Sequence, residues 1–416
     1  MTVSENDRTV TDAFFQPLDG LAATAAHARD CPGVSDARWL RMGLERLLQT
    51  GSSGRAFLQQ RRALGLAEEP AHASYFQALA SPRRLALLAE VERQVRVAAD
   101  SIPDRLADLP ELASYRCFAL DGHWHRAGAH DLRHKGQKMA VGHFYSLDLR
   151  THLLRHLATG KGLHEHDTSA LERVTPRGLK HEASKGERVL LIYDKGGIDL
   201  PFWQRCRREA GVYFLSRIKE NMGRTLLENR PLDPADLRNR GVQADQRIAL
   251  NGGHEMRLIT YTDPAGQTYQ FLTNDFRLPP GVIVELYRRR WEIEKVFDEF
   301  KNKLGERQAW GSSREARTTQ ALFLTLTHNL LEIYHAQLAR EHAVVPAAED
   351  RRRAQRAEKL QDDARDAGRS LSPLLTAARL ATQHSVKFIR WLATSLAQNL
   401  AETLAVPRLK ALYAYS

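Results

Sequence analysis

The fold class is decided by GERVLLIYDKGGIDLPFWQRCRREAGVYFLSRIK, residues 186–219. GERVLLIY is an apolar run of strand length that leads into Asp194, and GVYFLSRIK is a second such run. Between them, PFWQRCRREA has the character of a helix. A strand, a helix and a strand in this order predict an α/β unit.

The flanking segments extend this unit on both sides. Upstream, the segment YRCFAL (115–120) leads into Asp121, and HFYSLDL (143–149) and THLLRHL (151–157) are its expected strand partners. Downstream, between about 220 and 280, the segments QRIALNGG, EMRLITYTDPAG and QTYQFLTN predict a small meander of strands. The order of elements therefore predicts a mixed sheet flanked by helices, with a β-rich insertion.

A long helix is expected from about Pro280, through ELYRRRWEIEKVFDEFKNKLG at residues 285–305. At 100° per residue its side chains form two neighbouring stripes. One stripe is apolar: Ile293, Phe297, Phe300 and Leu304. The other is polar: Tyr287, Arg290, Glu294, Asp298 and Lys301. A solvated helix also carries Glu and Lys at such intervals, but here the polar stripe adjoins the packing stripe, so we expect it to face a cleft.

Three acidic residues lie on or just after these predicted elements. Asp121 and Asp194 each come after an apolar strand, and Glu294 lies on the helix. A lone Asp at such a position is commonly a turn residue or a helix cap, but the edge of an α/β sheet is also where clefts open. Carboxylate oxygens select Mg²⁺ or Mn²⁺, and two such ions about 3.5–4 Å apart can act on a phosphodiester.

Composition narrows the class of protein. The chain has 416 residues, a formal net charge of +11 and a pI near 9.6, which favours two to four domains and a polyanionic partner. Its three cysteines are widely spaced, so neither a disulfide framework nor a thiolate zinc site is expected. No segment has the length and apolarity of a membrane span and the first residues lack a signal pattern, so we expect a cytoplasmic protein.

The two ends of the chain are expected to be helical. Short helices with Gly and Ser turns fill the first hundred residues, and their arginines could seat on DNA as a helix-turn-helix-like module or form the solvated face of an ordinary bundle. These arginines, expected to be exposed, are Arg55, Arg61, Arg62, Arg83 and Arg84. Near the C-terminus, SPLLTAARLATQHSVKFIRWLATSLAQNL predicts further helices that could form a dimer contact.

The spacing Tyr287-x2-Arg290-x3-Glu294-x6-Lys301 resembles the YREK signature of DDE transposases of bacterial insertion sequences, the IS-four family. FALDGHW around Asp121 and LLIYDKGGIDLPFW around Asp194 are similar to the regions of that family's two catalytic aspartates. The resemblance covers about residues 35–335 and is most secure from 115 to 305. It implies a ribonuclease-H-like catalytic core that is interrupted by a β-rich insertion.

With the segment pattern, the resemblance predicts five regions. They are a helical N-terminal DNA-binding domain (1–110), the first part of the core (111–218), the β-rich insertion (219–280), the second part of the core with the Glu294 helix (281–340), and a helical C-terminal region (341–416).

The resemblance also implies roles for residues. Asp121, Asp194 and Glu294 would be the catalytic ligands of two Mg²⁺ ions, for which Mn²⁺ could substitute. Contacts to DNA are implied or suggested for the following residues: Tyr287, Arg290 and Lys301 at phosphates, Arg217 and Lys219 in YFLSRIKEN, and Trp291 or Trp124 as a stacking partner for a flipped base. For both tryptophans, packing in the core is the commoner role.

The implied reaction cuts double-stranded DNA at the element's terminal inverted repeats and joins the released 3′-hydroxyl to target DNA, both by in-line displacement at phosphorus. A homodimer on DNA and a location at the nucleoid would follow. Two alternatives stay open: a metal-dependent nuclease without strand transfer, and a non-catalytic DNA-binding derivative.

Several histidines follow Asp121 closely, namely His123, His125 and His130, and a further cluster reads His164-Glu165-His166-Asp167. A zinc site would need side chains that converge. We expect these histidines to face solvent instead.

Overall fold

The structure is a computed structural model. It describes residues 8–30, 33–49, 53–63, 71–99, 102–125, 133–134, 137–138, 141–160, 169, 173–180, 183–306, 308–346 and 386–414, and within 351–366 residues 351, 354–355, 358–359, 362–363 and 365–366. His130 and residues 164–167 lie outside the described residues.

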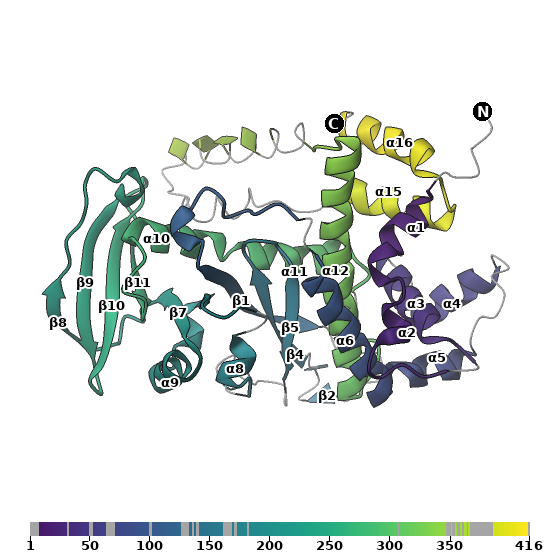
Figure 1. The fold of residues 1–416 in the computed structure, drawn as a ribbon, viewed down its shortest axis with the longest axis horizontal. Coiled ribbons are helices and arrows are strands. Elements are labelled where there is room, and N and C mark those ends of the chain that lie inside the picture. The colour runs from purple at the N-terminus through teal and green to yellow at the C-terminus, as the bar shows by residue number, and fades with distance from the viewer. Residues whose placement is uncertain are drawn as a thin grey trace.

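A nine-stranded sheet in the order β5-β4-β1-β6-β7-β11-β10-β9-β8 is the centre of the fold (Figure 1). Its first part follows the predicted segments: β1 (Tyr115–His125), β4 (Val141–Asp148), β5 (Leu154–Thr159), β6 (Arg188–Ile192) and β7 (Val212–Arg217). β1, β6 and β7 are parallel, whereas β4 and β5 are antiparallel neighbours on the other side of β1. The expected mixed α/β sheet flanked by helices is confirmed.

The predicted meander continues this same sheet. β9 (Val242–Leu250), β10 (His254–Thr262) and β11 (Thr268–Thr273) match the three predicted segments, and β11 pairs antiparallel with β7. A fourth strand, β8 (Arg224–Asn229), pairs with β9 and was not predicted. Gly252 and Gly253 have positive φ at the β9–β10 turn, the conformation that a tight hairpin requires. A separate two-stranded ribbon joins β2 (Arg133–His134) to β3 (Gln137–Lys138).

Alternate residues of β1 enter two different cores, because neighbouring side chains of a strand point to opposite faces. Phe118 and Leu120 pack in a core with α8 (Pro176–Leu179) and α9 (Leu200–Ala210). Cys117 and Ala119 belong to the other, larger core, with α10 (Pro280–Arg289) and α11 (Glu292–Asn302). Asp121, His123 and His125 continue the second set along the strand.

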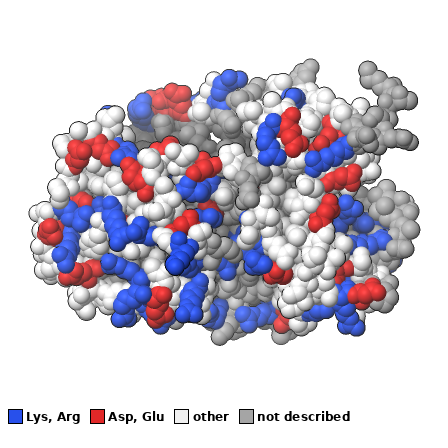
Figure 2. Space-filling view, in the orientation of Figure 1, with Lys and Arg blue, Asp and Glu red and all other residues white. Residues whose placement is uncertain are grey.

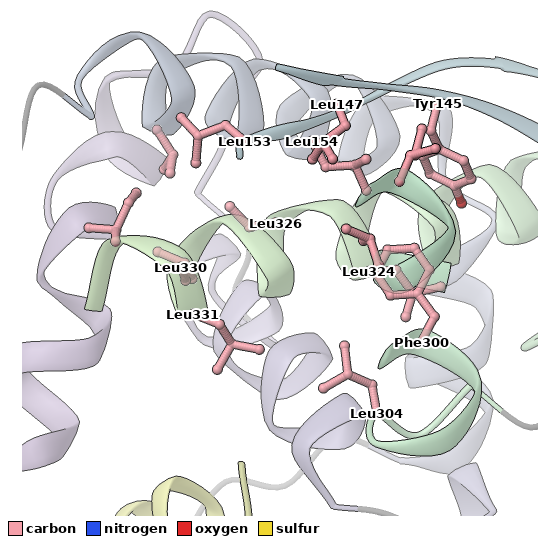
Figure 3. Close-up of a cluster of buried hydrophobic side chains, with 14 of the residues drawn as sticks. Tyr145, Leu147, Leu153, Leu154, Phe300, Leu304, Leu324, Leu326, Leu330 and Leu331 are labelled. Atoms are coloured by element: carbon pink, nitrogen blue, oxygen red, sulfur yellow. The ribbon is translucent and has the colours of Figure 1, made fainter. Parts of the chain in front are cut away.

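The long helix α12 (Arg314–His342) joins the sheet to the helical ends of the chain. Figure 3 shows apolar side chains of α12 near Tyr145 and Leu147 of β4, Leu154 of β5 with Leu153 just before it, and Phe300 of α11 with Leu304 just after that helix. The side chain of Asn329 in α12 also forms hydrogen bonds with the backbone of the edge strand β5. Its side-chain oxygen accepts from Leu154 N at 2.8 Å, and its side-chain nitrogen donates to Leu154 O at 2.9 Å.

The described parts of the N-terminal and C-terminal regions are mainly helical and lie beside α12 (Figure 1). The first part contains α1 (Val10–Phe15), α2 (Leu21–Thr24), α3 (Asp36–Leu48), α4 (Gly54–Ala63), α5 (His72–Leu79) and α6 (Pro82–Val97). The last part contains α15 (Val386–Ala397) and α16 (Glu402–Ala414). A bridge between Thr9 and Ala401 and a hydrogen bond from Val10 N to Leu400 O (2.8 Å) tie the two ends together.

The expectation that all five N-terminal arginines are exposed is wrong for Arg61 and Arg84, which are buried, and for Arg83, which is half-buried. The Arg84 guanidinium donates to Val34 O at 2.7 Å, and that of Arg61 pairs with Glu45. Arg83, which is half-buried, forms an ion pair with the buried Asp36 at 2.7 Å. These side chains hold helices together because buried charges are stable only when paired.

Surface charge is mixed on the face drawn in Figure 2. Lysine and arginine side chains gather over the region where Figure 1 draws α9, β7 and the neighbouring strands, with acidic side chains among them. Within the described part of the chain, no helix is both long enough and apolar enough to cross a bilayer.

Replacing Asn329 by alanine should destabilise the protein by about 2–4 kcal/mol. The Asn329 side chain is fully buried, so the substitution leaves the N–H and C=O groups of Leu154 without their hydrogen-bond partners. Chemical denaturation measures the change. Asn302→Ala, at an exposed asparagine of α11, is the control and should change stability by less than about 0.5 kcal/mol. Equal effects of the two substitutions would contradict this role of Asn329.

Candidate active site

Strand register brings the two aspartates to the same edge. The parallel pairing of β1 and β6 ends at Ala119 opposite Ile192, and Asp121 and Asp194 each follow two residues later. Neighbouring strands are about 4.8 Å apart, so both carboxylates lie at the carboxyl end of this strand pair. β1 does not end at Asp121 as expected. It continues to His125 because its pairing with β4 extends through that residue.

The expected long helix is broken. α10 ends at Arg289 and α11 begins at Glu292, with backbone bonds of the shorter i+3 type from Arg290 N to Tyr287 O (3.2 Å) and from Ile293 N to Arg290 O (3.3 Å). The polar stripe of a regular helix therefore does not continue through Arg290. Glu294 lies in the first turn of α11, close to the break.

Arg290 connects two of the three acids from this break. Its Nη2 lies 2.9 Å from Glu294 Oε1, and its Nη1 lies 3.6 Å from Asp121 Oδ2. The Arg290 residue is only 3% exposed, and its guanidinium carbon lies 5.0 Å from the ring centre of Trp291. A buried guanidinium thus holds the helical acid and the strand acid together.

Tyr287 makes the corresponding contact to the third acid. Its hydroxyl donates to Asp194 Oδ1 at 3.5 Å, a long hydrogen bond. The ring packs against Phe271 of β11, with 4.8 Å between ring centres. Burial raises the pKa of Tyr287 to about 12, so the phenol keeps its proton at neutral pH.

The surroundings of Asp121 and Glu294 disfavour the negative charge of these two carboxylates. Burial raises the pKa of the Asp121 carboxyl, although Arg290 opposes the rise. Burial also raises the pKa of Glu294, where Arg290 again opposes it and the charge of Asp121 adds to it. Burial disfavours the charge of Arg290 itself, yet its pKa is raised because Tyr287 and the acids surround it.

The oxygen-only ligand set suits hard divalent ions such as Mg²⁺ or Mn²⁺. The raised carboxyl pKa values indicate a site that a cation would stabilise. The described residues therefore fit the expected metal, and Asp121, Asp194 and Glu294 are the side chains that could hold it.

The other predicted DNA contacts are spread around these acids. Lys301 is exposed, and Arg217 and Lys219 are half-buried. Arg217 and Lys219 line one pocket with Lys195, beside Asp194, and the Arg217 guanidinium lies 5.2 Å from the ring centre of Tyr269. Trp291 is half-buried against Arg290, whereas Trp124 is 43% exposed.

The expectation that His123 and His125 face solvent is wrong, because both are only 2% exposed. They share the face of β1 with Asp121 and meet Glu306, which follows α11. Their alternate spacing after Asp121 was the signal in the sequence, since residues two apart on a strand share a face. No local signal marked Glu306, because it meets β1 only through the tertiary fold.

Comparison with known proteins identifies related chains. The family model for the transposase DDE domain matches residues 98–330. A putative transposase, y4zB, of Sinorhizobium fredii is 31% identical over 148 residues, which are 34% of this chain and 41% of that protein. A probable transposase for insertion sequence element IS5377 of Geobacillus stearothermophilus is 22% identical over 178 residues, 40% of this chain and 46% of that protein. The chain thus spans less than half of the length of these relatives.

Among solved structures, a piggyBac transposase synaptic complex with hairpin DNA aligns with 96% of this chain and 81% of that chain, at 10% identity and a TM-score of 0.37. A score this low does not establish a shared fold.

Asp121→Asn should stabilise the metal-free protein at about pH 7.5. The raised pKa means that ionising this carboxyl costs more in the folded than in the unfolded chain, so stability falls as the pH rises from the unfolded pKa through the folded one. We expect a melting midpoint higher by roughly 1–3 °C, and a smaller gain at about pH 4.5, nearer the ordinary carboxyl pKa of about 3.9.

Calorimetry at the two pH values measures the effect. The control is Glu209→Gln, which removes an exposed carboxylate of α9 and should leave the midpoint unchanged. A lower midpoint for Asp121→Asn at about pH 7.5 would show that its ion pair with Arg290 outweighs the cost of burying its charge.

Proposed function

The chain belongs to the transposase DDE domain family, and we propose that it cuts DNA at the ends of a mobile element and joins those ends to target DNA. One observation carries the proposal: Asp121 and Asp194 follow a shared strand register, and Arg290 joins Glu294 to Asp121. Acids from three separate elements are thereby directed to one edge of the sheet, where a phosphodiester could lie.

We infer further that residues 111–218 and 281–340 form a ribonuclease-H-like core. The strand order β5-β4-β1-β6-β7, with β1, β6 and β7 parallel and β4 and β5 antiparallel, supports this inference. The inserted strands, the helical N-terminal DNA-binding domain and the helical C-terminal region complete the proposed organisation.

Divalent ions held by Asp121, Asp194 and Glu294, two Mg²⁺ in our proposal, would neutralise charge and promote attack at phosphorus when bound. Arg290 then has a positioning role, since its guanidinium fixes Glu294 relative to Asp121. The Tyr287 hydroxyl orients Asp194 in the same way. Because its pKa is about 12, Tyr287 donates a hydrogen bond and does not act as a base at neutral pH.

DNA contacts are proposed for the basic side chains around the acids. Lys301 is exposed on α11, and Arg217 and Lys219 line a pocket with Lys195, the residue that follows Asp194. Arg290 and Tyr287 are buried against the acids, so they would reach a phosphate only at the acids themselves. A homodimer that holds two element ends is the arrangement that we propose for joining.

The catalytic prediction uses the full chain, DNA bearing its element's terminal inverted repeats, and Mg²⁺. Asp121→Asn, Asp194→Asn and Glu294→Gln should each lower cleavage and joining by more than about 100-fold. Replacing a residue that only orients a metal ligand costs up to about 100-fold, and loss of a ligand itself should cost more. Binding to the repeats should persist, and Glu209→Gln should keep full activity. Gel analysis separates cleaved from joined products.

The outcomes distinguish the alternatives. Cleavage without joined product would indicate a nuclease. Repeat binding without metal-dependent cleavage in the wild type would indicate a DNA-binding derivative. If any of the three variants joined ends at the wild-type rate, our assignment of the acids would be incorrect.

Lys301→Ala should weaken repeat binding and lower the slope of log K against log salt by about 1, the contribution of one phosphate contact. Lys410→Ala, which removes an exposed lysine of α16, is the matched control. Equal slopes for wild type and Lys301→Ala would remove this lysine from the DNA interface.

A further inference from the structure

A second group of metal-ligating side chains lies behind the acids. His123 and His125 are 2% exposed and Glu306 is 8% exposed. Within the described part of the chain, this is the one group of three or more His, Cys, Asp or Glu residues whose ligand atoms all lie within 4.8 Å of one another. It is separate from the oxygen-only site, although β1 contributes to both.

The spacing of the three side chains suits one small ion. His123 Nε2 lies 2.9 Å from Glu306 Oε2, and His125 Nδ1 lies 3.5 Å from Glu306 Oε1. Bonds of about 2.0–2.2 Å to a tetrahedral ion would set ligand atoms roughly 3.3 Å apart. The two distances lie on either side of that value, so the contacts of Glu306 with both histidines need little rearrangement, and all three ligand atoms already lie within 4.8 Å of one another.

His125 supplies an independent observation, because its Nδ1 is buried without a hydrogen-bond partner. The other ring nitrogen, Nε2, lies 3.1 Å from the Tyr145 hydroxyl. A ligating histidine commonly bonds through its second nitrogen in this way, which fixes the ring while the first nitrogen faces the metal. An unpaired buried nitrogen is costly, and a cation between it and Glu306 would satisfy both.

An ion pair between His123 and Glu306 does not account for the position of His125. His123 and Glu306 could form a buried pair by themselves, but that pair leaves His125 Nδ1 unsatisfied beside a carboxylate oxygen. The ring of His123 is held by stacking on Phe297, with 4.8 Å between ring centres and 18° between planes. The rings are thus fixed in a geometry that favours ligation.

We propose that His123, His125 and Glu306 bind one divalent ion of the zinc class. Imidazole nitrogen suits Zn²⁺ and similar transition metals, whereas the oxygen-only acids suit Mg²⁺ or Mn²⁺. Two histidines and one glutamate are a known zinc ligand set that leaves a fourth position for water. The site is a clamp: it joins β1 to the chain that follows α11, and thereby fixes the helix that carries Glu294.

The test uses the full chain stripped of metal with a chelator and then titrated with Co²⁺ or Zn²⁺. Wild type should bind about one equivalent of Co²⁺ with visible absorption typical of four-coordinate cobalt, and Zn²⁺ should displace it and raise the melting midpoint. Asp121→Asn and Glu294→Gln should retain this binding. His125→Ala and Glu306→Gln should weaken it by more than about 100-fold.

His254→Ala is the control, because it removes a half-buried histidine of β10 and should bind like wild type. Circular dichroism checks that each variant is folded. If His125→Ala and Glu306→Gln fail to fold, the wild-type spectrum decides, since absence of the absorption or of the zinc-dependent rise would overturn the proposal. Loss of binding in Asp121→Asn and Glu294→Gln would also overturn it, by assigning the ion to the acids.

The proposal does not depend on the transposase reaction. Zinc-class binding without DNA cleavage would support the clamp and count against the proposed function. Magnesium-dependent cleavage by a protein that binds no zinc-class ion would support the proposed function and contradict the clamp.

Discussion

The site depends on one buried cation. Arg290 is 3% exposed. It forms ion pairs with Glu294 in the first turn of α11 and with Asp121 on strand β1. A buried guanidinium is costly to desolvate unless carboxylates compensate it, and Glu294 is the acid within hydrogen-bond distance of Arg290. The two contacts of Arg290 connect the start of α11 to β1. The break between α10 and α11 falls at Arg290 itself.

The sheet provides the rigid frame for this interaction. The parallel register of β1 and β6 determines where Asp121 and Asp194 lie, and β4 keeps β1 extended beyond the point where β6 ends. At one side of this unit, Asn329 of α12 satisfies the edge of β5. At the other side, β11 continues the sheet from β7 and brings Phe271 beneath Tyr287. The inserted strands therefore help to support the tyrosine that contacts Asp194.

Most of the strands could be predicted from sequence because apolar runs of strand length are local signals. The exposed strand β8 has no buried residues and was missed. The positions of Asp121 and Asp194 after those runs were also visible. The helix break was not, since Arg290 and Trp291 are acceptable helix residues and no local signal marks a break there. Burial of Arg61, Arg84, His123 and His125 was missed for the same reason. Whether a polar side chain is exposed depends on the partner that the fold brings to it.

One face of β1 combines three environments within a few residues. Cys117 and Ala119 pack in the apolar core, Asp121 belongs to the acids, and His123 and His125 meet Glu306. A strand advances roughly 6.6 Å for each pair of residues, so the oxygen ligands and the nitrogen ligands are neighbours but cannot share one ion. α11 covers both sets. Its first turn is held through Glu294 and Arg290, and the chain after its last turn is held through Glu306. Phe297 and Phe300 pack against Tyr145 of β4, and a charge contact lies on each side of this apolar packing. Glu294 therefore owes its position relative to Asp121 to polar contacts at both ends of the helix as well as to the apolar stripe between them.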